Sequence, residues 1–143
     1  MPLSKLKVLI IDDSVYKAMD ITRALEFSGV RDITRVREQE SAFEAIYESI
    51  ESKAPFNLIV TDMHYPLERG MEADYDAGYI LIERLKEERI EIPVIICSSR
   101  NYTESGILGT VWYNELCDLS REFGEILRKL IDRVNSAINK LSE

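Results

Sequence analysis

The sequence is poor in the residues that build metal clusters, disulfide frameworks and histidine-dependent catalytic triads. Its 143 residues include two cysteines, Cys97 and Cys117, and a single histidine, His64. There is no Cys-x-x-Cys motif and no Cys/His cluster, so a zinc site is not expected, and sites that need several histidines are excluded. We expect both cysteines to be free thiols in a protein of the reducing cytoplasm.

Segments that would place the chain outside the globular class are also missing. Four prolines and six glycines are too few for a linker-rich or collagen-like chain, and a hydrophobic share of 45% is too high for a disordered one. No apolar run approaches the roughly 18 residues that span a membrane, and the first residues lack the pattern of a signal peptide. We therefore expect one domain over residues 1–143, with no membrane partner.

Basic residues are outnumbered by acidic ones. The 18 Lys and Arg residues stand against 26 Asp and Glu residues, which gives a formal net charge of −8. An acidic surface does not attract a phosphate backbone, so we do not expect this chain to bind nucleic acid by itself.

Apolar runs alternate with segments of helical spacing along the whole chain. Continuous apolar runs at 7–11, 57–61 and 94–97 predict strands that are buried on both faces, and shorter segments at 33–36 and 109–113 predict two more. Helices are predicted after the N-cap Ser14 as far as Gly29, at 41–52, at 79–88, and from Asp118 or Ser120 to about Leu141. The polar stretch 63–78 is predicted to be a long loop.

This alternation predicts a doubly wound α/β fold. Strands separated by helices form a parallel sheet with right-handed crossovers, and the helices cover both faces in a three-layer unit. We expect five strands in the order 2-1-3-4-5. About ten residues separate Ser98 from the fifth strand, which is too few for an average helix and its connections. The fourth helix is therefore predicted to be short or missing.

Polar groups end three of the predicted strands. Asp12 and Asp13 follow the first strand, Asp62 the third, and Ser98 with Ser99 the fourth. Ligands of open parallel sheets bind outside the carboxyl ends of the strands, where the winding reverses. With the first and third strands adjacent, three carboxylates share one pocket, and their repulsion is relieved by a hard divalent cation such as Mg²⁺.

The segments 9–14 (LIIDDS), 58–63 (LIVTDM) and 93–99 (PVIICSS) resemble the receiver domain of two-component response regulators. The resemblance extends over roughly residues 5–140. It implies the flavodoxin-like, CheY-like version of the fold and a signalling function in a phosphorelay rather than an enzymatic one.

The resemblance also implies roles for individual residues. Asp62 matches the phosphoacceptor, which forms an aspartyl phosphate. Asp13 matches the direct Mg²⁺ ligand and Asp12 its partner. His64 would offer Mg²⁺ its backbone carbonyl.

Three further positions match the family pattern. Ser98 corresponds to the hydroxyl that binds a phosphoryl oxygen, and Ser99 is small where the phosphodonor must approach. Gly78 corresponds to the glycine that opens the third helix, so the loop that precedes it is longer than usual.

One departure concerns the lysine that the family carries at the end of the fifth strand. Residues 111–115 (VWYNE) contain no lysine, and Arg100 is the nearest candidate cation in the sequence. The aromatic residue of that strand is not securely matched either, since Thr110 or Trp112 takes its place depending on the register.

We therefore expect a receiver domain that takes phosphate from a histidine kinase or phosphotransfer protein onto Asp62 with Mg²⁺. It would signal by contact with a downstream protein whose identity the sequence does not give. The sequence also leaves open whether the chain forms a homodimer. The alternative is a phosphorylation-independent pseudo-receiver adaptor with the same fold, which the missing lysine favours. A third hypothesis, an Mg²⁺-dependent phosphohydrolase, is disfavoured because His64 stands where such enzymes place an acid/base carboxylate.

Overall fold

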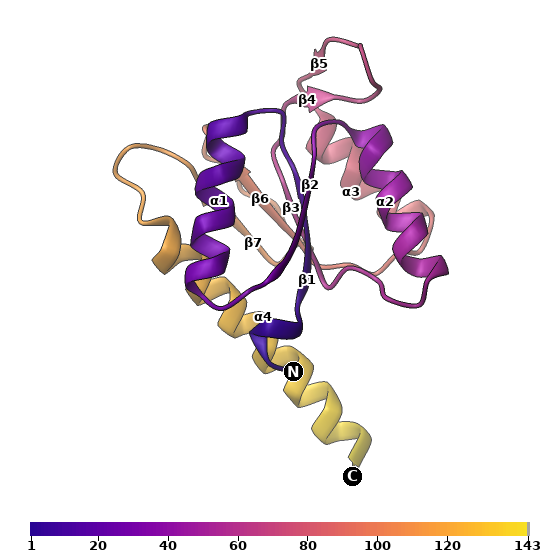
Figure 1. Cartoon of the computed structure of the whole chain (residues 1–143), viewed down its shortest axis with the longest axis vertical. Helices are drawn as coiled ribbons and strands as arrows, with labels where there is room; N and C mark the ends of the chain where they lie inside the picture. Colours follow the sequence, from indigo (N-terminus) through magenta and orange to yellow (C-terminus); the bar gives the residue numbers. More distant parts are fainter. Residues whose placement is uncertain (143) are drawn as a thin grey trace.

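The computed structural model describes residues 1–142 and contains a five-stranded parallel sheet (Figure 1). Its strands are β1 (Lys7–Ile11), β2 (Asp32–Val36), β3 (Leu58–Thr61), β6 (Val94–Ser98) and β7 (Gly109–Trp112). The spatial order is β2-β1-β3-β6-β7, and each neighbouring pair runs in parallel. This order is the predicted 2-1-3-4-5 arrangement of five main strands.

Four α-helices cover the two faces of the sheet. They are α1 (Val15–Phe27), α2 (Gln39–Glu51), α3 (Ala77–Glu87) and α4 (Leu119–Ser142), preceded by a short 3₁₀ turn, η1 (Leu3–Lys5). The sheet is seen nearly edge-on in Figure 1, with α1 and α4 on one side and α2 and α3 on the other. The chain therefore has the predicted three layers.

Burial on both faces explains why the central strands lack polar alternation. Val8 and Ile10 of β1 pack into the core under α1 and α4, whereas Leu9 and Ile11 pack into the core under α2 and α3. All four side chains are fully buried. A strand covered by helices on both sides has no solvent face on which a polar residue is favoured.

The helix ends follow local chemistry that is visible in the sequence. Ser14 caps α1, because its Oγ accepts a hydrogen bond from the amide of Lys17 at 3.3 Å. Gly29 closes the same helix with a φ of 108°. Of the two predicted caps of the last helix, Asp118 is the correct one, since its Oδ1 accepts the amide of Arg121 at 3.1 Å.

The connection between β6 and β7 was predicted correctly from the sequence, whereas the connection between β3 and α3 was predicted only in part. Residues 99–108 join β6 to β7 without a helix, so the missing fourth helix is confirmed. Residues 63–78 were predicted to be a loop, but they contain an antiparallel hairpin of β4 (Tyr65–Pro66) and β5 (Ala73–Asp74), and α3 already begins at Ala77. Strands of two residues are too short for hydrophobic periodicity to reveal them.

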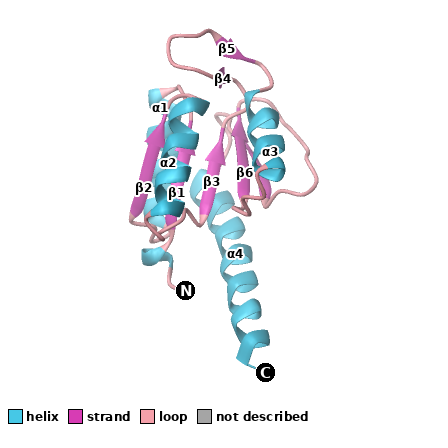
Figure 2. Ribbon diagram, turned by 90° about the vertical axis from the view of Figure 1, so that its right-hand side faces the viewer, coloured by secondary structure: helices cyan, strands magenta, loops and turns pink. Residues whose placement is uncertain are grey.

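The last helix extends well beyond the sheet (Figure 2). Phe123 and Leu127 in its first half are fully buried in the core, whereas Leu141 near its end is 89% exposed. The apolar stripe predicted along this helix thus reaches further than the core does. No helix in the described part of the chain is long and apolar enough to cross a membrane.

Candidate functional site

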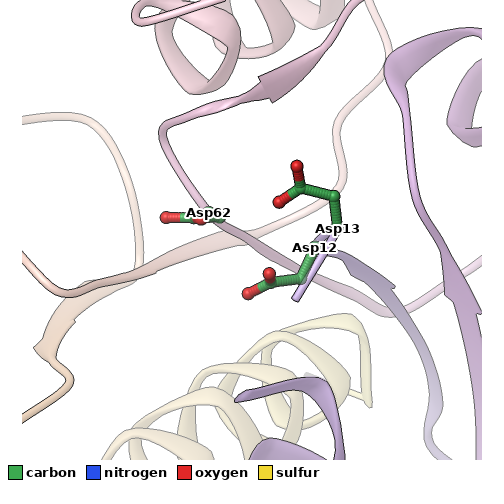
Figure 3. A group of neighbouring side chains, drawn as sticks. All are labelled: Asp12, Asp13 and Asp62. Atoms are coloured by element: carbon green, nitrogen blue, oxygen red, sulfur yellow. The ribbon is translucent and has the colours of Figure 1, made fainter. Parts of the chain in front are cut away.

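Three carboxylates meet at the carboxyl edge of the sheet (Figure 3). Asp12 and Asp13 follow β1 and Asp62 follows β3. These strands pair in parallel, and the amide of Asp62 continues the ladder by donating to the carbonyl of Ile11 at 2.9 Å. One carboxylate oxygen from each aspartate lies within 4.8 Å of the others. The prediction that the topology gathers these three side chains is confirmed.

The three carboxylates have different surroundings. Asp12 is fully buried; its Oδ1 accepts the amide of Ser14 at 2.9 Å, while its Oδ2 accepts no hydrogen bond with acceptable geometry. Asp62 is partly buried, and its Oδ1 accepts the amide of Met63 at 2.7 Å. Asp13 is partly exposed. The site therefore offers one buried oxygen to which no amide or hydroxyl donates, and two carboxylates that solvent reaches.

A lysine from α1 lies among these carboxylates. The Nζ atom of Lys17 is 3.0 Å from Oδ2 of Asp12 and 3.0 Å from Oδ1 of Asp62, and the lysine side chain is only 7% exposed. Sequence patterns alone did not predict this residue, and Arg100 was the candidate cation. The only available signal was a lysine three residues after an N-cap, on a helix that starts beside the acidic pair.

Burial and charge act in opposite directions on this ion pair. Burial raises the pKa of Asp12, and the Lys17 ammonium and the Ser14 amide offset that rise only in part. Burial alone would lower the pKa of Lys17, but the carboxylates of Asp12 and Asp62 outweigh it and hold the pKa above its ordinary value of 10.5. Lys17 therefore carries its charge at neutral pH.

Two further side chains fix the segment that carries Asp12, Asp13 and Lys17. Arg35 of β2 donates from Nε to the carbonyl of Asp12 at 3.0 Å, and its Nη2 is buried without a hydrogen-bond partner. Tyr113, directly after β7, donates its hydroxyl to Asp20 of α1, and the Lys17 Nζ lies 5.9 Å from the centre of its ring. The start of α1 is thus held from both sides.

The backbone of Asp62 is held by the start of α3. The amide of Gly78 donates to the carbonyl of Met63 at 3.1 Å, and a Cβ at this position would lie 2.8 Å from the carbonyl oxygen of Asp62. No real side chain tolerates that distance. The glycine expected at the start of the third helix therefore has a packing reason: it lets α3 approach the segment that carries Asp62.

The remaining predicted positions lie around this group without a direct contact to it. Ser98 is buried at the end of β6, next to β3, and its Oγ accepts the amide of Arg100 at 3.4 Å. Ser99 is exposed, and its carbonyl accepts the indole of Trp112 at 3.0 Å. The side chain of Arg100 is exposed and forms no ion pair with any described carboxylate. Among the described residues, the cation of the site is Lys17 and not Arg100.

The structure also fixes the register of Thr110 and Trp112 and the orientation of the His64 side chain. In the register of β6 and β7, Trp112 pairs with Ser98 and Thr110 pairs with Ile96. The imidazole of His64 points to the hairpin, where it stacks on Tyr75 with 4.3 Å between the ring centres. A side-chain role of His64 at the carboxylates has no support in this arrangement.

The group of carboxylates fits a hard divalent cation. Oxygen ligands from carboxylates suit Mg²⁺, and no amide or hydroxyl donates to the buried Oδ2 of Asp12, whose one charged neighbour is the Lys17 ammonium at 3.0 Å. Lys17 already supplies one positive charge at this position, so a metal ion would share the carboxylates with the ammonium.

Comparisons with known proteins agree with the geometry of the sheet. No family model and no curated protein sequence matches the chain. Solved structures do match: a response regulator receiver domain from Clostridium thermocellum has a TM-score of 0.68 and 16% identity, over 92% of this chain and 98% of the other. A CheY-like receiver domain from Methanospirillum hungatei has a TM-score of 0.64 and 20% identity, over 92% and 98%.

A third similar structure is that of the response regulator TrrA from Thermotoga maritima, in complex with Mg²⁺ and BeF. Its TM-score is 0.65 at 16% identity, over 87% of this chain and 98% of TrrA. The chain thus has the fold of response regulator receiver domains.

Proposed function

We propose that this chain is a phosphoacceptor domain that receives a phosphoryl group on Asp62 while Asp12, Asp13 and Asp62 bind Mg²⁺. The observation that carries the proposal is the approach of these three carboxylates to within 4.8 Å at the ends of adjacent strands. In support, TrrA, which has the same fold, was solved with Mg²⁺ and BeF.

The nucleophile is a carboxylate oxygen of Asp62. Oδ1 accepts the Met63 amide, whereas Oδ2 accepts no hydrogen bond from any described residue and is available for attack. With a phosphohistidine as donor, the carboxylate forms a P–O bond as the P–N bond breaks. The electron pair stays on the imidazole nitrogen, which takes a proton from water. Bound Mg²⁺ would supply charge neutralisation for the phosphoryl oxygens.

The other residues of the site have supporting roles in this proposal. Asp13, which solvent reaches, is the direct metal ligand, and the backbone carbonyl of His64 completes the protein's contribution. Ser98 donates its hydroxyl to a phosphoryl oxygen, and the exposed Ser99 leaves room for the donor. A histidine kinase or phosphotransfer protein supplies the phosphate in the cytoplasm, and the output is contact with another protein.

The test uses a small acyl phosphate as donor, with Mg²⁺, and intact-mass spectrometry as readout. We expect the native chain to gain the mass of one phosphoryl group, and Asp62→Ala to gain none. Asp13→Ala should keep the acceptor and slow the gain, because it removes the proposed direct metal ligand. A modified species that survives in Asp62→Ala would assign the acceptor to another residue and refute the proposal.

Metal binding is tested separately by calorimetry and by Trp112 fluorescence. We expect Mg²⁺ to bind in the millimolar range, and Asp13→Ala to weaken this binding more than Asp12→Ala does. Absence of any response up to tens of millimolar Mg²⁺ would show that the carboxylates are not a metal site.

One observation favours a second function, that of a phosphorylation-independent adaptor. Lys17 already neutralises part of the charge of Asp12 and Asp62, so the pocket does not need a metal to be stable. If this reading is correct, neither acyl phosphate nor Mg²⁺ changes the mass or the fluorescence of the chain. The acidic group is then a structural remnant, and the protein binds its partner in one constant state.

A further inference from the structure

We propose that Lys17 is the resident counter-ion of this site: it competes with Mg²⁺ for Asp12 and Asp62, and it neutralises the phosphoryl group that Asp62 acquires. The second half of this inference rests on the proposed function, whereas the first half does not. The family pattern places a lysine after the last strand. In this chain the charge comes from the first turn of α1, at the opposite end of the sequence.

The geometry of α1 gives Lys17 a fixed position. Its amide is bound by the N-cap Ser14, and the Asp20–Tyr113 hydrogen bond ties the next turn of the helix to the end of β7. The ammonium lies 3.0 Å from an oxygen of each of Asp12 and Asp62, and the ring of Tyr113 borders it at 5.9 Å. The charge therefore lies between the ends of β1 and β3, on the side that faces the end of β7.

No other described cation can take this role from its present position. Arg35 uses its Nε for the backbone carbonyl of Asp12, and Arg100 is exposed. Within the described residues, Lys17 is the only cation at ion-pair distance from any of the three carboxylates. A phosphoryl group adds a charge of about −1.5 to −2, so this ammonium is the protein's own means of balancing it.

Lys17 and Mg²⁺ both depend on the same oxygens. A divalent ion at Asp12 and Asp62 would sit a few ångströms from the ammonium, where like charges repel strongly. Removing the ammonium should therefore strengthen metal binding while it weakens phosphoryl transfer. A purely structural role of Lys17 predicts losses in both properties together, so the two roles give opposite results for the metal.

The experiment compares Lys17→Met, which keeps an unbranched side chain one atom shorter and removes its charge, with the native chain at pH 8. Mg²⁺ affinity is measured by calorimetry, and the rate of phosphorylation by intact mass at saturating Mg²⁺ with acyl phosphate. In that reaction Asp62 forms a P–O bond to phosphorus, and the donor's carboxylate leaves with the electron pair of the broken P–O bond. We expect about tenfold tighter Mg²⁺ binding and roughly 10²-fold slower phosphorylation.

Two matched variants serve as controls. Arg23→Met removes the same charge from an exposed position of the same helix, and it should change neither property. Lys17→Arg keeps the charge, and it should retain weak Mg²⁺ binding even if its different shape slows phosphorylation. Because Lys17→Arg leaves no buried carboxylate uncompensated, it gives a result even if Lys17→Met folds poorly.

The outcomes separate this inference from the proposed function. If the native chain is not phosphorylated but Lys17→Met binds Mg²⁺ more tightly, the proposed function fails and competition by Lys17 is supported. If Lys17→Met and native chains bind Mg²⁺ equally and are phosphorylated at equal rates, the inference is refuted while the proposed function stands. Equal Mg²⁺ affinity of a folded Lys17→Met and of Lys17→Arg also refutes it.

Discussion

Two connections leave the carboxyl edge of the sheet near Asp62, and they are held in very different ways. The hairpin connection (residues 63–76) follows β3, and the short connection (residues 99–108) follows β6. Both lie beside the site, since the first begins directly after Asp62 and the second directly after Ser98. Their contacts decide which side of the site is rigid.

The hairpin connection is bonded both to the end of β3 and to α2. Tyr65 is fully buried, and its hydroxyl is bonded to Thr61 at 3.0 Å. Arg69 donates to Glu40 at 2.8 Å and also pairs with Glu44 of α2. The amide of Glu40 in turn donates to the carbonyl of Leu67 at 2.9 Å. These bonds attach the hairpin to α2.

The short connection has few such contacts. Its residues 101–107 form no hydrogen bond with another described residue, and the ring of Tyr102 meets Tyr79 edge-on at 6.1 Å between centres. Leu108 is its one buried side chain. The connection after β3 is thus ordered by its bonds to α2, whereas the connection after β6 has few contacts to order it. Four predictions test this difference.

The largest effect is expected from two glycine substitutions. Gly78→Ala should lower the free energy of unfolding by about 2 kcal/mol, because the new Cβ meets the backbone oxygen of Asp62 at 2.8 Å. Gly106→Ala in the short connection meets no atom within 4 Å and has only its φ of 80° to oppose it, so about 1 kcal/mol is expected. Urea denaturation measures both values. Equal losses would show that α3 is free to move away from Asp62.

A pair of tyrosine substitutions should give a smaller difference. Tyr65→Phe removes the hydroxyl that accepts a hydrogen bond from Thr61, and we expect the free energy of unfolding to fall by about 1 kcal/mol. Tyr102→Phe removes a hydroxyl without a described partner, so its stability should stay within about 0.5 kcal/mol of the native chain. A loss in Tyr102→Phe as large as that in Tyr65→Phe would contradict the contrast drawn between the two connections.

The third prediction concerns local order and not global stability. Amide hydrogen exchange in the unmodified chain should be slower in residues 63–76 than in 101–107. Arg69→Met should raise the exchange rate of the hairpin connection toward that of the short connection, while the sheet stays protected. Met71 and Glu68 offer nearby exposed positions for control substitutions. An unchanged exchange rate in Arg69→Met would mean that the ion pairs of Arg69 do not hold the hairpin.

The smallest effect is a pH dependence of the hairpin. The hydrogen bond from Arg69 holds the pKa of the Glu44 carboxyl below its ordinary value of 4.5. A carboxyl whose pKa is lowered by folding stabilises the structure above its ordinary pKa, and this contribution is lost as pH falls through the lowered value. Exchange in 63–76, measured relative to the intrinsic rate at each pH, should therefore increase below about pH 4.5, and Glu44→Gln should remove that increase. The same acid-induced increase in Glu44→Gln would contradict this assignment to Glu44.

The sequence by itself determined the sheet and the position of the acidic group. Unbroken apolar runs such as 7–11 and 58–61 have one stable solution, a strand covered on both faces, and strands alternating with helices must run in parallel. Once β1 and β3 are neighbours, Asp12 and Asp62 have to meet, since each directly follows its strand. This part of the site depends only on local patterns and on chain topology.

The tertiary structure alone decided which cation lies in the site and how the connection beside it is folded. Lys17 reads in the sequence as one more charged residue on an amphipathic helix, and only the packing of α1 beside α4, with Asp20 bonded to Tyr113, turns its side chain inward. The hairpin after β3 has strands too short to carry a periodic signal, and contacts with α2 hold it in place. Both features depend on the angle and distance between packed elements, which side-chain packing sets and which no local pattern of residues encodes.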